Sequence, residues 1–117
     1  MDEFTKAYIE CALWSSIDDE DEALDTNYSV ADLSPECLEK MICDCKDFQC
    51  SAYPYLTDLN REHAGHDFWL TRNGHGAGFW DDNGEHYTLE AGEKLTELCK
   101  DFCEQTLYVD RGILYVE

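Results

Sequence analysis

Hydrophobic residues recur every three or four positions in three segments of the chain, and this spacing predicts three helices. The first helix covers residues 2–18. Asp2 and Glu3 lie at its start, where the partial positive charge of a helix N-terminus stabilises acidic side chains. Its apolar face is expected to consist of Phe4, Ala7, Tyr8, Cys11 and Trp14.

The second helix begins at Ser34, a favourable N-cap, and has Pro35 in its first position. Pro54 ends it or bends it near Tyr53. Its apolar stripe is expected to contain Leu38, Met41, Ile42, Cys45, Phe48 and Ala52. Four charged residues fall off this stripe and are expected to face water: Glu39, Lys40, Asp44 and Asp47.

The third helix lies within residues 87–105. Thr88 is its expected N-cap, and Gly92 weakens it locally. The stripe that would face the core is Ala91, Leu95, Leu98 and Phe102. The capping box is absent, because Ala91 occupies the position of its glutamate.

Two segments predict β-hairpins. At the end of the chain, β-rich runs flank Asp110-Arg111-Gly112, so Tyr108 should face Tyr115 and Val109 should lie near Leu114. In the middle, Asn73-Gly74 is a strong two-residue turn signal. That turn would pair Arg72 with His75, Leu70 with Ala77, Phe68 with Phe79, Trp69 with Gly78, Thr71 with Gly76, and Asp67 with Trp80.

These elements predict one α+β domain spanning residues 1–117. Three helices would pack on an antiparallel sheet made from the two hairpins, in the order α-α-β-β-α-β-β. An acidic loop at about residues 17–26 would separate the first two helices, since six of the eight residues from Asp18 to Asp25 are acidic.

Charge is the strongest compositional signal. The chain has 27 Asp and Glu against 8 Lys and Arg, a formal net charge of -19. Such a protein is repelled by nucleic acids and anionic membranes and attracted by basic protein surfaces, including grooves that hold DNA or RNA. The alternative is a charge that serves solubility or high salt. The candidate partner-binding residues are Asp18, Asp19, Glu20, Asp21, Glu22, Asp25, Asp44, Asp47, Asp81, Asp82 and Glu85.

Histidines and cysteines offer a second class of function, a small enzyme or a metal-binding protein. Loops would have to gather the four histidines, His63, His66, His75 and His86, because no zinc-protease or paired CxxC pattern is present. His66 and Asp67 would point to opposite faces of a strand, which disfavours a general-base pair. Two cysteine pairs at helical spacing, Cys43 with Cys50 and Cys99 with Cys103, could supply four thiolates, although cysteine also packs as a buried apolar residue. We therefore expect no cofactor and no enzymatic activity.

A third class is a regulator that binds through an exposed aromatic patch with Trp69 and Trp80 as anchors. The seven cysteines are expected to be mostly free thiols, because their number is odd and the N-terminus does not resemble a signal peptide. With no apolar run long enough to span a membrane, the protein is expected in the cytoplasm.

The string HDFWLTRNGHGAGFWD, residues 66–81, resembles a segment of small uncharacterised proteins encoded by bacteriophages and prophages. The stretches AYIECALWSS, NYSVADLSPE and LYVDRGILYV are also similar to parts of those proteins. The resemblance implies a viral accessory protein in a bacterial cell, of a kind that often occupies host proteins that handle nucleic acid, such as restriction or CRISPR components. It carries over no functional residues, and neither the cysteines nor the DDEDEALD run belongs to the shared pattern.

Overall fold

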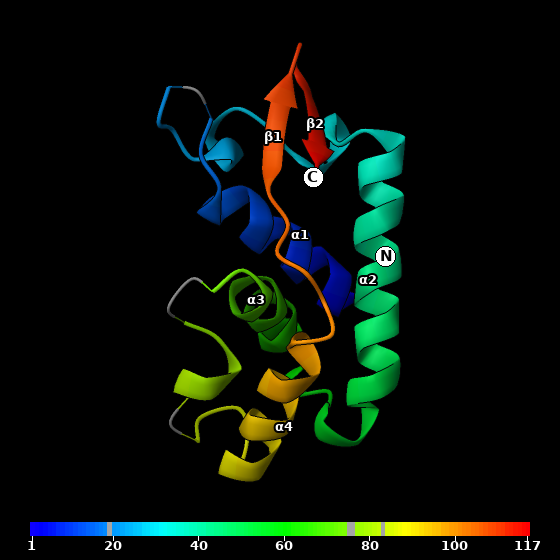
Figure 1. Ribbon diagram of the computed structural model, residues 1–117, viewed down its shortest axis with the longest axis vertical. Coiled ribbons are helices and arrows are strands. Elements are labelled where there is room, and N and C mark those ends of the chain that lie inside the picture. Colours follow the sequence, from blue (N-terminus) through cyan, green and yellow to red (C-terminus); the bar gives the residue numbers. More distant parts are fainter. Residues whose placement is uncertain (19, 75–76, 83) are drawn as a thin grey trace.

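Helices dominate the computed structural model, which describes residues 1–18, 20–74, 77–82 and 84–117 (Figure 1). Within these ranges there are four α-helices: α1 (Glu3–Ser15), α2 (Pro35–Ala52), α3 (Arg61–Arg72) and α4 (Leu89–Cys99). One antiparallel hairpin follows them, β1 (Leu107–Asp110) and β2 (Ile113–Val116). Short 3-10 turns connect the helices at Leu24–Thr26, Val30–Asp32, Tyr53–Tyr55 and Phe79–Asp81.

Side-chain caps fix the starts of three helices. The carboxylate of Asp2 accepts a hydrogen bond from the Thr5 amide at 2.8 Å. The hydroxyl of Ser34 accepts one from the Cys37 amide at 3.0 Å, and that of Thr88 one from the Ala91 amide. These contacts confirm the predicted N-caps of α2 and α4, since each satisfies an amide that has no partner within the helix.

Two helices, α2 and α3, pack on α1, which crosses the middle of the molecule, and α4 packs on α2 and α3 (Figure 1). The closest approach is between α1 and α3, where Gly65 lies against the Phe4 carbonyl oxygen and a Cβ atom at this position would overlap that oxygen. The longest helix, α2, runs along one side, and the hairpin and α4 lie toward opposite ends of the long axis (Figure 1). No helix in the described ranges is both long and apolar enough to cross a membrane.

The central hairpin predicted around Asn73-Gly74 is wrong, and with it the fold class of three helices on a sheet of two hairpins. Residues 61–72 form α3 instead, so the pairings of Phe68 with Phe79, Leu70 with Ala77, Trp69 with Gly78 and Asp67 with Trp80 do not exist as strand pairs. The two pairings that involve His75 and Gly76 lie outside the described residues.

Helical periodicity explains α3 better than strand alternation does. Phe68 and Trp69 are both buried, although neighbouring residues of a strand would point to opposite faces. Ala64 lies one turn before Phe68, and Gly65 one turn before Trp69. Asn73 is the C-cap of α3, and Gly74 follows it with φ +64°. An Asn-Gly pair suits this left-handed helix ending as well as a hairpin turn, so the signal was ambiguous.

Aromatic rings form the centre of the core. The rings of Phe48 from α2 and Phe68 from α3 stack with centroids 4.2 Å apart. Phe4 from α1 stacks on Phe48, and Phe102, after α4, meets Phe68 edge-on. Tyr8 contacts Phe68 and Trp69. Because α1, α2, α3 and the segment after α4 each contribute a ring, this cluster joins the helices that the sequence places far apart.

The terminal hairpin has the predicted register. Tyr108 pairs with Tyr115 and Val109 with Leu114, and the two tyrosine rings stack. Leu33 forms a parallel bridge to Leu114, whose carbonyl oxygen accepts a hydrogen bond from the Ser34 amide at 2.8 Å. These contacts attach the hairpin to the segment that begins α2.

Three side chains do not lie where their helical stripes placed them. Trp14 is 61% exposed because it lies on the same side of α1 as the exposed Glu3 and Glu10. Ile42 is 39% exposed, and Asp44 is buried. Asp44 is three residues after Met41 and four before Phe48, so it shares the buried face of α2 rather than facing water.

Candidate functional site

Acidic side chains occupy most of the protein's charged surface. Of the 26 acids in the described ranges, 21 are exposed, three are half-buried and two, Asp44 and Asp67, are buried. Six of the eight Lys and Arg residues are exposed. Folding therefore leaves the surplus of negative charge in contact with solvent.

Few of these exposed carboxylates have a cationic partner. Among the described residues, Asp58 is the exposed acid that pairs with a Lys or Arg, at 3.3 Å from Arg61. Lys40 and Arg72 both bind the buried Asp44. Two cations thus neutralise an interior carboxylate, and, Asp58 apart, the exposed carboxylates of the described residues have no Lys or Arg partner.

The acidic segment at residues 17–26 is an ordered turn, in the part that the structure describes. Ile17 and Ala23 form an isolated antiparallel bridge, and the next residue, Leu24, is fully buried. The Asp18 carboxylate accepts hydrogen bonds from the amides of Glu20 and Glu22 at 2.8 and 3.0 Å. With Asp18 holding the turn, its exposed acids are Glu20, Asp21, Glu22 and Asp25. Asp19 lies outside the described residues.

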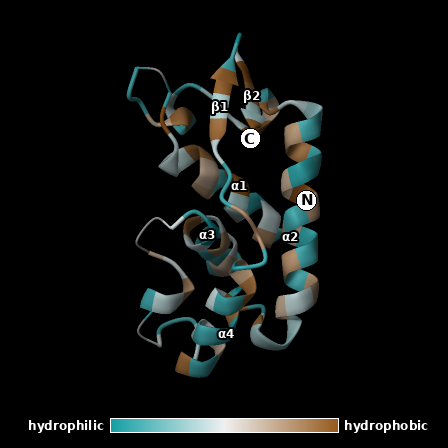
Figure 2. Cartoon of the chain, viewed as in Figure 1, coloured by the Kyte–Doolittle hydropathy of each residue, from teal (hydrophilic) through white to brown (hydrophobic). Residues whose placement is uncertain are grey.

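The other predicted contact residues are divided among separate parts of the molecule. Asp47 is exposed on α2, and Asp81 and Glu85 are exposed between α3 and α4. The 3-10 turn Phe79–Asp81 and the acidic turn lie at different heights along the long axis (Figure 1). The acidic turn itself projects from the molecule as a largely hydrophilic segment (Figure 2). With four exposed acids within six residues, this turn has the highest density of acidic side chains among the predicted contact groups.

Asp44 is engaged inside the protein. Its Oδ2 accepts a hydrogen bond from Arg72 Nη1 at 2.9 Å, and its Oδ1 accepts one from Lys40 Nζ at 2.7 Å. Arg72 also donates to the Tyr8 hydroxyl and, through Nε and Nη2, to the carbonyl oxygen of Cys103. The Arg72 guanidinium lies over the rings of Phe68 and Phe102. Asp44 is unavailable to a partner, because this network joins it to α1, α3 and the segment after α4.

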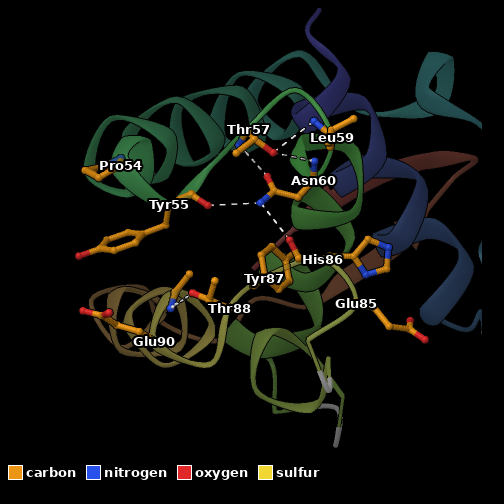
Figure 3. A pocket seen from close by; sticks show the side chains of 11 residues that line it. Pro54, Tyr55, Thr57, Leu59, Asn60, Glu85, His86, Tyr87, Thr88 and Glu90 are labelled. Atoms are coloured by element: carbon orange, nitrogen blue, oxygen red, sulfur yellow. Dashed lines mark hydrogen bonds between the residues drawn. The ribbon is translucent and has the colours of Figure 1, made fainter.

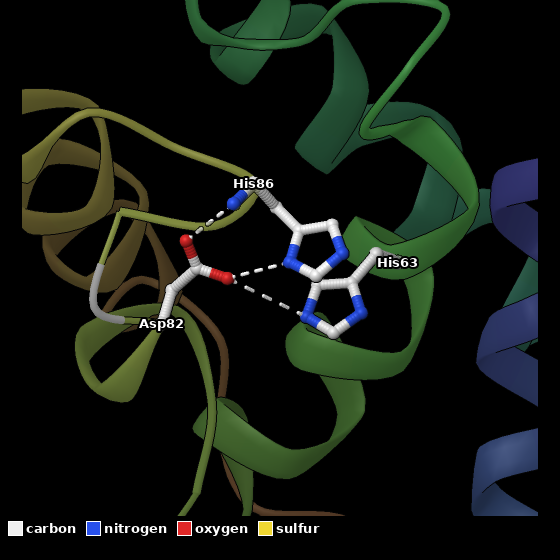
Figure 4. A group of neighbouring side chains, drawn as sticks. All are labelled: His63, Asp82 and His86. Carbon is white, nitrogen blue, oxygen red and sulfur yellow. Dashed lines mark hydrogen bonds and ion pairs between the residues drawn. The ribbon is translucent and has the colours of Figure 1, made fainter.

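A second group of polar residues lies between the first turn of α3 and the segment before α4. His63 and His86 stack with ring centroids 3.7 Å apart, and Asp82 faces both rings (Figure 4). Asp82 Oδ1 is 2.7 Å from His86 Nδ1 and 3.8 Å from His63 Nε2. His63 Nε2 also lies 3.1 Å from the buried Asp67, whose Oδ2 accepts a hydrogen bond from the Tyr87 hydroxyl.

Hydrogen bonds hold the Asp82 carboxylate in place. Its Oδ2 accepts from the backbone amides of His86 and Tyr87 at 2.6 and 3.0 Å. Desolvation acts to raise the pKa of Asp82, but these bonds and the His86 ring outweigh it and lower that pKa. For Asp67 desolvation prevails and raises the pKa, although His63 and Tyr87 oppose it. The cluster thus contains one carboxylate held in its charged form and one whose charge is disfavoured by burial.

A hollow of about 460 Å³ lies beside this cluster. Figure 3 shows His86 and Tyr87 on one side of it and Tyr55, Thr57 and Asn60 on another. Asn60 Nδ2 donates to the carbonyl oxygens of Tyr55 and His86, each at 3.3 Å. This amide fixes the backbone that carries His86 relative to the start of α3.

The cysteines do not assemble the four-thiolate site that the sequence left open as an alternative. Cys99 is buried and Cys103 is exposed, and Cys43 and Cys50 lie on the exposed side of α2. Burial raises the pKa of Cys99 to about 12, which disfavours a thiolate there. Among the described residues, His63, Asp82 and His86 are the group that brings three ligand atoms within 4.8 Å of one another.

The proposed aromatic anchors are also separated. Trp69 is buried, and its Nε1 donates to the Ser15 hydroxyl at 2.9 Å. Trp80 is 57% exposed. Trp69 cannot serve as a surface anchor, so the predicted two-tryptophan patch is wrong.

Sequence reasoning missed the histidine–aspartate cluster and the buried arginine. Two His/Asp pairs four residues apart, His63 with Asp67 and Asp82 with His86, were the available signal. The first pair shares a helix face, but only the fold reveals that the second pair meets it. Arg72 was signalled by its position as a single cation after the apolar residues Phe68 to Leu70.

Comparison of the chain with protein-family models, with curated protein sequences and with solved structures found no match.

Proposed function

We propose that this chain is a phage-type accessory protein that inhibits a host nucleic-acid-binding protein by occupying its basic groove. Its surface carboxylates take the place of phosphates and bind the Lys and Arg side chains that would otherwise hold DNA or RNA. The observation that carries the proposal is the uncompensated surface charge, with 21 exposed acids and few cationic partners.

Uncompensated charge has a thermodynamic cost that a partner removes. Exposed carboxylates repel one another in the free protein, and a cationic groove replaces that repulsion by attraction. Long-range attraction also increases the rate of encounter between oppositely charged surfaces. If the surface carboxylates were instead paired with Lys and Arg residues of the same chain, binding would relieve no repulsion and the encounter would not be accelerated.

The acidic turn is the expected centre of contact. In its described residues the backbone is held by Asp18 and by the bridge between Ile17 and Ala23, which reduces the conformational entropy that binding would cost. It presents Glu20, Asp21, Glu22 and Asp25 within six residues. The exposed face of α4 carries a comparable set, Glu90, Glu93 and Glu97, with Asp101 just beyond the helix, and provides an internal comparison.

The test compares two variants with equal loss of charge. A target protein is first captured from bacterial lysate on the immobilised chain. The target is then bound to a fluorescent DNA or RNA fragment, and each variant of the chain is added at rising concentration to measure how much of the fragment it displaces. Neutralising the turn (E20Q/D21N/E22Q/D25N) should raise the concentration needed for half-release about 30-fold, if each lost ion pair contributes about 0.5 kcal/mol. Asn and Gln keep the side-chain shapes, and Asn tolerates the φ of +61° at position 21.

The matched control is E90Q/E93Q/E97Q/D101N, which removes the same charge from α4 and the residue after it. Its effect should be several-fold smaller. Equal effects of the two variants would show that the turn is not the centre of contact and that the loss of net charge alone weakens binding. If neither variant changes the release, or if the chain releases no nucleic acid from any captured protein, the proposed function is wrong.

A further inference from the structure

We propose that His63, Asp82 and His86 form a binding site for one divalent transition-metal ion of the zinc type, with His63 Nε2, Asp82 Oδ1 and His86 Nδ1 as ligands (Figure 4). The site is independent of the acidic turn and of the proposed inhibition. It would join the first turn of α3 to the segment before α4, which are already connected by the stack of His63 on His86 and by hydrogen bonds of Asn60 and Tyr87.

The ligand types and spacing fit a tetrahedral ion. Two imidazoles and one carboxylate are an established ligand set for zinc, and bonds of about 2.0–2.1 Å place neighbouring ligand atoms about 3.3–3.5 Å apart. Here Asp82 Oδ1 lies 2.7 Å from His86 Nδ1 and 3.8 Å from His63 Nε2, on either side of that separation. One ligand atom from each residue lies within 4.8 Å of the other two, so changes of about 1.5 Å or less in each separation complete the triangle.

The carboxylate is oriented before any ion binds. Asp82 Oδ2 is held by the amides of His86 and Tyr87, and this leaves Oδ1 directed at the two imidazoles. The Asp82 side chain is 5% exposed. Such outer hydrogen bonds fix a ligating carboxylate and increase metal affinity in known sites. The buried Asp67 lies on the other side of His63, with its Oδ2 3.1 Å from His63 Nε2.

Binding requires the rings to leave their present stack. The two imidazole rings are nearly parallel, with centroids 3.7 Å apart, so the lone pairs of their nitrogens lie in nearly parallel planes. To coordinate one ion, both lone pairs must point at the same position. His86 has a side chain 33% exposed, so its ring has room to rotate. His63 would exchange its contact with Asp67 for the ion. Three protein ligands leave the fourth position of a tetrahedral ion to water or to a molecule in the adjacent hollow, which His86 borders (Figure 3).

The experiment measures zinc binding by calorimetry at pH 7.5 on a C43S/C50S/C103S chain, which removes the exposed thiols as competing ligands. We expect one zinc ion per chain. The H63A and H86A substitutions should each weaken binding at least about tenfold. The H66A substitution is the matched control, because His66 lies on the same helix outside the cluster, and it should leave the affinity unchanged.

A second measurement does not depend on the variants' folding. In nuclear magnetic resonance spectra of the C43S/C50S/C103S chain, zinc should shift the imidazole signals of His63 and His86 and spare those of His66. The proposal is overturned if no zinc binds, if H63A and H86A bind zinc as tightly as the parent chain, or if the imidazole signals of His63 and His86 do not respond.

Discussion

Replacing Arg72 by methionine should destabilise the protein by about 3–5 kcal/mol, as expected when one partner of a buried ion pair is removed. The Arg72 side chain is 2% exposed and holds Asp44, the Tyr8 hydroxyl and the Cys103 carbonyl oxygen. Methionine fills much of the same space but donates no hydrogen bond. The Asp44 carboxylate would stay buried with Lys40 as its remaining partner. Urea unfolding at pH 7 under reducing conditions measures the difference.

Two comparisons separate the ion pair from the loss of a cation in general. The K46M substitution removes an exposed positive charge from α2 and should change the free energy of unfolding by about 0.5 kcal/mol or less. The D44N/R72M double variant should lose less stability than the sum of the losses from the two single substitutions. In the double variant, neither a carboxylate at position 44 nor a guanidinium at position 72 stays buried without its partner. A loss below about 1 kcal/mol for R72M would show that the network contributes little.

Replacing Gly65 by alanine should cost about 2–3 kcal/mol, although alanine is the better helix former by about 1 kcal/mol. The added Cβ atom would overlap the Phe4 carbonyl oxygen and lie 3.0 Å from the Ala7 Cβ. Both atoms belong to α1, so relief requires the two helices to separate and the aromatic core between them to loosen. Thermal unfolding followed by circular dichroism gives the change in stability.

The G92A substitution in α4 is the graded control for this contact. Its Cβ would meet the Phe79 carbonyl oxygen at 2.9 Å, a milder conflict with a short connecting turn. The loss of stability should therefore be smaller than for G65A. An alanine at position 65 that leaves stability unchanged or raised would contradict the close packing of α1 on α3.

Local signals in the sequence predicted the elements that depend on neighbouring residues. The caps Ser34 and Thr88, the end of α2 before Pro54 and the register of the terminal hairpin all follow from a few adjacent side chains. The central segment failed because Asn73-Gly74 can end a helix or turn a hairpin. The choice rests on whether Phe68 and Trp69 share one core, which is a tertiary property.

The candidate sites show the same division. The exposure of Glu20, Asp21, Glu22 and Asp25 could be anticipated from a run with few apolar residues. Asp44 could not be distinguished from Asp47, because its burial depends on Arg72, 28 residues away. Likewise, His63 and His86 come together only because the chain returns to the start of α3 before α4 begins. The residues next to each histidine in the sequence give no sign of this contact.

The most direct test of the proposed inhibition is the dependence of binding on salt. The association constant between the intact chain and the basic protein that it captures is measured from 0.1 M to 1 M NaCl. Over this range the Debye length falls from about 10 Å to about 3 Å. If surface carboxylates replace phosphates, the association constant should fall at least about tenfold, along a straight line in log–log coordinates. An affinity that stays constant across the range would contradict the account.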